Sequence, residues 1–113
     1  MGTGTAEGTV HPVGKPAGFA DGTGTAAQFN GPTGVACDGN SNVYVDDNGN
    51  NRIRRIVVAT GVVSTLAGST QGSADGPGAA AQFNRPSGVA FDGTGNGNLY
   101  VANTNNNRIR VVK

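Results

Sequence analysis

The sequence lacks most of the side chains on which catalytic and metal-binding chemistry usually depends. Its 113 residues include no tryptophan, one cysteine and one histidine. A single cysteine cannot form an intrachain disulfide, and one histidine cannot supply a zinc site with several imidazole ligands or a Ser-His-Asp triad. We therefore expect no catalytic constellation and no cofactor. We also expect Cys37, which lies in the apolar stretch at residues 35–37, to be a buried and unreactive thiol.

Charged side chains are also scarce, at 13% of the chain with a net charge of +1. Binding to nucleic acid depends on many Lys and Arg side chains that neutralise phosphates, so this composition excludes nucleic acid as a predicted partner. The sequence contains no apolar run of the length, about 18–20 residues, that spans a bilayer, and no signal-peptide pattern. We expect no membrane partner, although the richness in Gly, Thr and Asn and the scarcity of Lys favour secretion.

What the sequence does contain is a long internal repeat. Residues 20–39 recur as residues 74–93 at an offset of 54, and residues 40–56 recur as residues 96–112 at an offset of 56. The second copy has gained two residues, at 94–95, and an insertion of this kind is tolerated where the backbone runs over the surface. The repeat indicates that the chain is built from two similar structural units.

Each copy has the pattern of short antiparallel β-strands. Apolar and polar residues alternate, and Gly, Asn, Asp and Pro separate the runs. Residues 8–14 stand 54 positions before residues 62–68, so an opening strand at 9–13 matches the last strand of the first copy. One helical turn is predicted at 79–82. The other predicted strands are residues 34–37, 42–45, 52–57 and 61–66 in repeat one (about 20–68) and residues 88–91, 98–101 and 108–112 in repeat two (about 74–113).

Three short motifs recur in both copies and resemble the NHL repeat. They are P-x-G-V-A-x-D, N-x-Y-V and N-R-I-R, at residues 32–38, 42–45 and 51–54 and again at residues 86–92, 98–101 and 107–110. The resemblance implies an all-β fold, a β-propeller in which each repeat forms one four-stranded antiparallel blade and the blades usually number six. The chain departs from this pattern because it carries two repeats only.

Two blades alone leave apolar faces and strand edges uncovered, and such edges recruit partners. If the opening strand of one chain pairs with the closing strand of the next, head-to-tail contacts close a ring. We expect a homotrimer with six blades; rings of four or eight blades, an open filament, and an excised or engineered propeller fragment are the alternatives. The predicted interface residues are Thr9, Val10, His11, Val13, Arg108, Ile109, Val111 and Val112.

Two aspartates are the candidate ligand site. Asp38 and Asp92 end the first strand of each copy, and the resemblance places that strand beside the propeller axis. Each carboxylate either caps its own turn, since glycine follows both times, or joins an axial ring that binds Ca²⁺ or Mg²⁺. The first hypothesis gives a binding or structural module, with a small ligand, a glycan or a protein at the channel mouth. The second gives a metal-dependent hydrolase or lyase, as in some members of this propeller class.

Arginines form the remaining candidate feature. Alternation puts Arg52 and Arg54 on the same side of their strand, and Arg110 repeats Arg54 in the second copy. Some members of the family bind RNA on a basic face, but the near-neutral charge favours ion pairs to Asp46 or Asp47 and packing of the arginine stems. Tyr44 and Tyr100 stand at matching positions, where we expect them to pack between blades.

Overall fold

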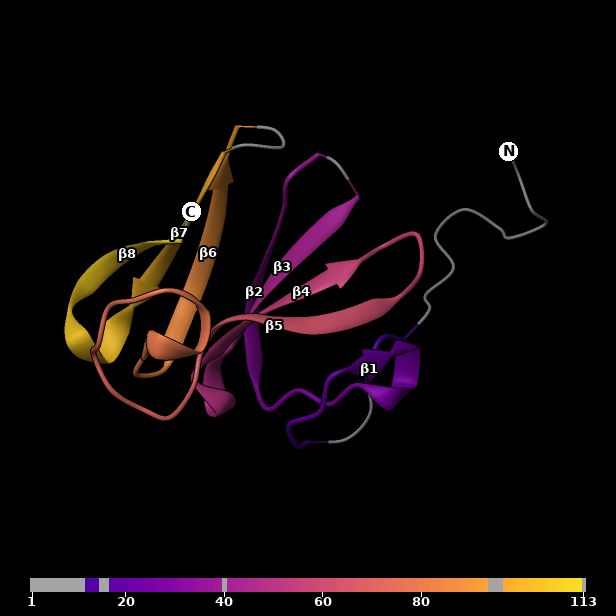
Figure 1. Ribbon diagram of the computed structural model, residues 1–113, viewed down its shortest axis with the longest axis horizontal. Helices are drawn as coiled ribbons and strands as arrows, with labels where there is room; N and C mark the ends of the chain where they lie inside the picture. The colour runs from indigo at the N-terminus through magenta and orange to yellow at the C-terminus, as the bar shows by residue number, and fades with distance from the viewer. Residues whose placement is uncertain (1–11, 15–16, 40, 94–96, 113) are drawn as a thin grey trace.

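Eight strands in two antiparallel sheets make up the regular structure of the computed structural model, together with four single turns of 3₁₀ helix (Figure 1). The model describes residues 12–14, 17–39, 41–93 and 97–112 of the chain. One sheet has five strands and the other has three. The predicted all-β fold with antiparallel strands is confirmed.

The first repeat folds into an antiparallel meander whose outer edge carries one additional strand. The last strand of the meander pairs with a two-residue strand from the start of the repeat, before β2, so the spatial order is β1-β5-β4-β3-β2. The sequence did not predict this short strand, because two residues carry no alternation. The strands are β1 (Gly22–Thr23), β2 (Pro32–Cys37), β3 (Asn42–Asp47), β4 (Arg52–Val57) and β5 (Val62–Gly68).

The second repeat forms the same meander but with three strands among the described residues. They are β6 (Pro86–Asp92), β7 (Asn98–Asn103) and β8 (Arg108–Val112), in the order β6-β7-β8. The register is also repeated: Val45 pairs with Arg54 in the first sheet, and Val101 pairs with Arg110 in the second. Each sheet therefore corresponds to one predicted blade, and we call them blade one and blade two.

Asparagine closes the turn between the second and third strand of each blade. A 3₁₀ turn spans Asn48–Asn50 in blade one and Thr104–Asn106 in blade two. Asn51 and Asn107 follow these turns with φ values of +57° and +55°. Asparagine tolerates this left-handed conformation better than most residues. Both turns fall between strands that the sequence predicts, 42–45 and 52–57 in blade one and 98–101 and 108–112 in blade two.

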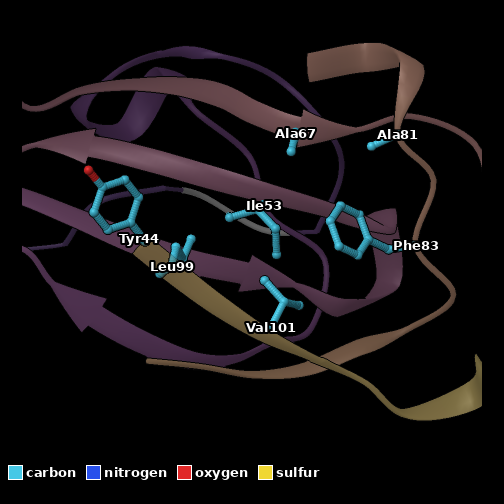
Figure 2. Close-up of a cluster of buried hydrophobic side chains, with 7 residues drawn as sticks. All are labelled: Tyr44, Ile53, Ala67, Ala81, Phe83, Leu99 and Val101. Carbon is cyan, nitrogen blue, oxygen red and sulfur yellow. The ribbon is translucent and has the colours of Figure 1, made fainter. Parts of the chain in front are cut away.

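The two blades pack face to face, with β2 and β6 side by side (Figure 1). Figure 2 shows the buried apolar cluster that fills the space between them. Blade one contributes side chains from β3, β4 and β5, blade two contributes side chains from β7, and the segment before β6 adds a phenylalanine and an alanine. The cluster consists of Tyr44, Ile53, Ala67, Ala81, Phe83, Leu99 and Val101.

Five of the predicted strands are one to three residues longer in the structure, and two other predicted elements differ from it or extend outside the described residues. The helical turn expected at 79–82 is a 3₁₀ turn at Gly78–Ala80, displaced by about one residue. In the opening strand expected at 9–13, residues 9–11 lie outside the described residues. Val13 is described, is not part of a strand and is exposed.

Candidate functional site: the open edge of blade two

The outer edge of β8 has no neighbouring strand among the described residues. In blade one the matching strand, β4, pairs on that side with β5 along the length of the strand. In blade two the described order ends at β8. Backbone groups along such an edge are available to pair with another strand.

A cavity of about 610 Å³ lies along this edge. One wall is β8, and the opposite wall is the segment at residues 75–78. Leu66, Ala67 and Phe83 also line the cavity. In blade one the corresponding space, between β4 and β1, is occupied by β5. The cavity therefore has the position and the walls of the slot that takes the fourth strand of a blade.

Arg110 fixes the outer wall of this slot. Its Nη1 donates to the Gln82 carbonyl oxygen at 3.0 Å, and its Nη2 donates to the Ala74 carbonyl oxygen at 2.9 Å and to the Asp75 carboxylate at 2.6 Å. The guanidinium also lies over the Phe83 ring, 5.1 Å from its centroid. These contacts hold the segment before β6 at a fixed place relative to β8.

Arg54 makes the same set of contacts in blade one. It donates to the carbonyl oxygens of Gln28 and Ala20, at 2.8 and 2.7 Å, and to the Asp21 carboxylate at 2.9 Å. Its guanidinium lies 4.8 Å from the centroid of the Phe29 ring. The arginine clamp is thus a repeated feature, and blade two retains it although β8 has no described outer neighbour.

The sequence predicts the arginine of the clamp but not its partners. The other members of the clamp, at 20, 21 and 28 in the first copy and at 74, 75 and 82 in the second, lie in the segment before the first predicted strand of each copy, where the sequence predicts only one helical turn, at 79–82. The signal was present, because this segment is nearly identical in the two copies. A connecting segment that recurs almost unchanged in both copies indicates a structural contact.

The predicted pairing of arginine with aspartate is confirmed at one of the two aspartates. Arg54 Nη1 donates to Asp47 at 2.9 Å, and both side chains are fully buried. Arg52 and Arg54 share a side of β4, as predicted, since both guanidiniums lie over the Phe19 ring. Because Arg54 is buried, it does not contribute to a basic face on the surface.

The four predicted interface residues of the closing strand all lie on β8. Arg108, Ile109 and Val111 are exposed, and Val112 is partly buried against the core cluster. Their predicted partners Thr9, Val10 and His11 lie outside the described residues, and Val13 makes no strand pairing. The structure therefore describes one side of the expected interface.

The structure puts Asp38 and Asp92 in unlike environments. Asp38 is buried and accepts hydrogen bonds from Tyr44 Oη (3.0 Å), Asn42 Nδ2 (2.9 Å) and the Asn42 backbone N–H (3.3 Å). Asp92 is exposed. Burial, followed by the bond to Asp38, raises the pKa of Tyr44. Of the residues that the structure describes, no three His, Cys, Asp or Glu gather as a metal site would require.

The prediction that Cys37 is buried was wrong. Cys37 is exposed. It lies on β2 but on the side that points away from blade two, whereas its neighbour Ala36 packs against the core cluster. A local apolar pattern cannot show which side of a strand the second sheet will cover.

Tyr44 is packed between blades as predicted, and its ring stacks on that of Phe91. Tyr100, the counterpart of Tyr44, lies on the side of blade two that faces away from blade one and is partly buried. No described helix is long and apolar enough to span a membrane.

Two blades with the same register, turns and arginine clamp define the repeat in three dimensions. The family model of the NHL repeat matches residues 83–112 of this sequence. The chain belongs to the NHL-repeat family. The match covers the three strands of blade two, and blade one repeats them strand for strand.

Curated relatives share this sequence pattern. The chain is 39% identical over 93 residues to SUPPRESSOR OF QUENCHING 1, a chloroplastic protein of Arabidopsis thaliana, and this match covers 81% of the chain. It is 36% identical over 98 residues to NHL repeat-containing protein 2 of Homo sapiens, over 84% of the chain. The chain spans only 9% and 13% of the lengths of these two proteins.

Solved structures confirm the propeller-type fold of this NHL-repeat chain. An auxiliary nutrient binding protein of Bacteroides thetaiotaomicron superposes with a TM-score of 0.76 at 25% identity, over 89% of this chain and 27% of that one. A protein of unknown function from the same organism gives a TM-score of 0.75 at 30% identity, over 82% of this chain and 24% of that one. The chain is thus a β-propeller unit that matches about a quarter of each of these proteins.

Proposed function

We propose that this chain is a self-assembling binding and structural module, which closes a six-bladed propeller as a homotrimer by exchange of strands. In this assembly the segment at residues 9–13 of one copy enters the slot beside β8 of the next copy. The observation that carries the proposal is the slot itself, because its wall of residues 75–78 is held in place by Arg110 although no described strand fills it.

The repeat in the backbone supports this assignment of the inserted strand. Gly14 and Gly68 stand at matching positions, with φ values of +97° and +100°. A Cβ atom on Gly14 would lie 2.9 Å from the Phe29 ring, and one on Gly68 would lie 3.1 Å from the Phe83 ring. Because Gly68 ends β5, the segment that leads into Gly14 corresponds to a fourth strand.

Pro12 falls at the position of this strand where a proline disrupts the backbone pairing least. It matches Leu66, which lies at the register shift of β5 between the pairs Arg54 with Thr65 and Ile53 with Ala67. A proline removes a backbone donor, and within sheets it is tolerated at edges and irregularities. The same alignment sets Val10 opposite Val111.

A second copy supplies the strand more readily than the same chain does. Gly14 is bonded to blade one, since its N–H donates to the Gly24 carbonyl oxygen at 3.1 Å. Figure 1 shows the β1 region and β8 at opposite ends of the molecule. A head-to-tail contact repeated between identical copies closes a ring when the rotation allows it. Three copies of two blades give six.

Binding rather than catalysis is the activity that this fold supports best. Two of the similar solved structures, at 25% and 26% identity, are auxiliary nutrient binding proteins, and the described residues offer no group of three metal-ligating side chains. We propose that the assembled ring takes a small ligand, a glycan or a protein at the channel mouth.

The mass of the 113-residue chain in solution tests the assembly. Light scattering coupled to size exclusion should give three times the chain mass of 11.2 kDa. A monomer at micromolar concentration would overturn the strand exchange, and twice or four times the chain mass would overturn the trimer.

A matched pair of variants tests the inserted strand. Val10→Pro removes a backbone donor within the proposed strand and should convert the trimer to smaller species. Thr3→Pro, outside residues 9–13, should leave the trimer intact. Equal behaviour of the two variants would contradict the proposal.

A further inference from the structure

The contact between the two blades provides a template for a second contact that the described chain leaves open. Within the molecule, Tyr44 and Ile53 of blade one face Leu99 and Val101 of blade two (Figure 2). Paired positions in neighbouring strands share a side of the sheet, so Ala36 and Arg55, which pair with Tyr44, lie on the same side of blade one. We call this the rear side of a blade and the opposite side its front.

The repeat puts matching residues on two outward-facing sides. On the rear of blade two, Tyr100 and Ile109 take the places of Tyr44 and Ile53. Ile109 is 70% exposed, whereas Ile53 is fully buried. On the front of blade one, Val35 takes the place of Val89 and is 68% exposed. Isolated exposed apolar residues are common, but two large ones on complementary sides indicate surfaces that are covered.

The sequence makes the exposed rear side more apolar than the buried one. Asp46 and Arg55 of blade one are replaced in blade two by Ala102 and Val111. Asp46 Oδ2 and Arg55 Nε are buried between the blades without a hydrogen-bond partner, which costs free energy. A side of the sheet that faced water would gain charged residues, and here both are lost. The rear of blade two therefore has the composition of an interface.

A polar contact at one end of the blade contact sets its alignment. Asn51 Oδ1 accepts from the Arg85 backbone N–H at 2.8 Å, and Asn48 Nδ2 donates to the Pro86 carbonyl oxygen at 2.9 Å. The corresponding turn of blade two has Asn107, which is exposed. Beside it lies a hollow of about 290 Å³, whose lining includes Ala102 and Ile109.

Blade one carries a backbone segment that corresponds to Arg85 and Pro86. Gly31 corresponds to Arg85, and the two residues have closely similar φ values, +62° and +52°. Gly31 and Pro32 are both exposed. In a second copy they present the backbone N–H and carbonyl groups that Arg85 and Pro86 present to blade one within the chain.

We infer that the rear of blade two is a docking surface for the front of blade one of a second copy, with Tyr100 against Cys37 and Asn107 bonded to the Gly31 N–H. The contact is head to tail and repeats the internal blade contact. This inference rests on the proposed assembly but concerns the rear side of blade two, whereas the strand slot lies along its edge; Ile109 and Val111 border both. The proposed contact also accounts for the exposure of Cys37 and Ile109 in a single chain, because a neighbouring copy would cover each of them.

Cross-linking through Cys37, the only cysteine, tests the predicted contact directly. Packed sheets lie about 10 Å apart, which exceeds the Cα separation of about 4.4–6.8 Å that a disulfide spans. A short bismaleimide suits this gap. In the variant Tyr100→Cys each chain carries one thiol on each surface, so we expect covalent dimers and trimers on a denaturing gel.

Two controls test whether the cross-link is specific to these two surfaces and head to tail. Thr60→Cys puts the second thiol on an exposed hairpin away from both surfaces and should give no such ladder. The unmodified chain should also give none, because head-to-tail docking keeps two copies of Cys37 apart. Dimers from the unmodified chain would show a symmetric contact instead, and no ladder from Tyr100→Cys would show that these surfaces do not meet. Either result would overturn the inference.

Substitutions on the docking surface provide a second, independent measurement. Tyr100→Asp, at a residue that does not line the strand slot, should dissociate the assembly, whereas Val58→Asp, which charges an exposed residue outside the surface, should not. Asn107→Ala should raise the dissociation constant about tenfold, the effect of about one hydrogen bond, while Asn105→Ala should not. If Val10→Pro abolishes the trimer but Tyr100→Asp does not, the strand exchange stands and the docking surface is wrong. If Tyr100→Asp abolishes the trimer but Val10→Pro does not, the docking surface stands and the strand exchange is wrong.

Discussion

Tyr44 and Phe91 stack across the boundary between the two blades, with ring centroids 5.7 Å apart and planes within 9° of parallel. The hydroxyl of the same tyrosine donates to Asp38. The residue that corresponds to Phe91 in the first copy is Cys37, so the docking surface proposed between copies has a tyrosine without an aromatic partner. Contacts between copies therefore lack an interaction that the contact within each chain has.

Replacing Cys37 by phenylalanine should strengthen the assembly. The variant Cys37→Phe gives Tyr100 of the neighbouring copy a ring to stack on. A stacked pair contributes about 0.5–1.5 kcal/mol beyond the burial of its area, which corresponds to a fall of about 2- to 10-fold in the dissociation constant. Sedimentation or light scattering on dilution measures this. Cys37→Ser is the control and should show no gain, and weaker assembly of Cys37→Phe would contradict the predicted contact.

The two arginine clamps should differ in their contribution to stability. Arg54→Met leaves Asp47 buried without its cation, so the free energy of unfolding should fall by about 3–5 kcal/mol. Arg110→Met removes the same carbonyl contacts, but the aspartate that it pairs with, Asp75, is exposed. Its loss should be about 1–2 kcal/mol. Urea unfolding at one fixed chain concentration compares the two, and a larger loss for Arg110→Met would contradict the prediction.

Glycine should be required at the end of β5 and dispensable before β2. A Cβ atom on Gly68 would lie 2.6 Å from the Asn51 carbonyl oxygen, and its φ is +100°. Gly68→Ala should therefore lower the melting temperature strongly. Gly31 has a φ of +62°, a Cβ atom there would meet nothing within 4 Å, and its counterpart Arg85 adopts the same conformation. Gly31→Ala should cost only about 1–2 kcal/mol.

Asp46 should make the protein less stable as the pH rises. Burial raises the pKa of Asp46 above its ordinary value of 3.8, although hydrogen bonds from Thr33 oppose the shift. The folded chain therefore holds this proton more tightly than the unfolded chain. The resulting stabilisation is complete below pH 3.8 and is lost as the pH rises through the raised pKa.

The variant Asp46→Asn isolates this effect. Its side-chain oxygen still accepts the bonds from Thr33, and its amide group replaces the carboxylate oxygen that has no partner. We expect Asp46→Asn to be more stable than the parent chain at pH 7 and equal to it below pH 3.8, as measured by urea midpoints. Asp92→Asn, at an exposed carboxylate, should leave the pH profile unchanged. A parent chain that is the more stable of the two at pH 7 would show that the charge of Asp46 is compensated.

Strands and turns of both blades could be predicted from the sequence because they depend on neighbours in the chain. The alternation at residues 52–57 and the asparagines at 48–51 act locally, and β8 at Arg108–Val112 was predicted to the residue. The strand β1 was missed because Gly22 and Thr23 are ordered by pairing with Val63 and Val62, about 40 positions away. The clamp was missed for the same reason, since Arg54 binds carbonyl groups 26 and 34 positions before it.

The amino-acid sequence by itself determined that this chain is a pair of antiparallel blades of the NHL type, because a repeat of alternating strands and turn residues acts through local backbone preferences. Only the tertiary structure decided which side of each strand is covered. The same V-A-x-D segment has its third residue stacked in the core as Phe91 and exposed as Cys37. Burial depends on the sheet that packs against a strand, and the residues within the strand do not encode that neighbour.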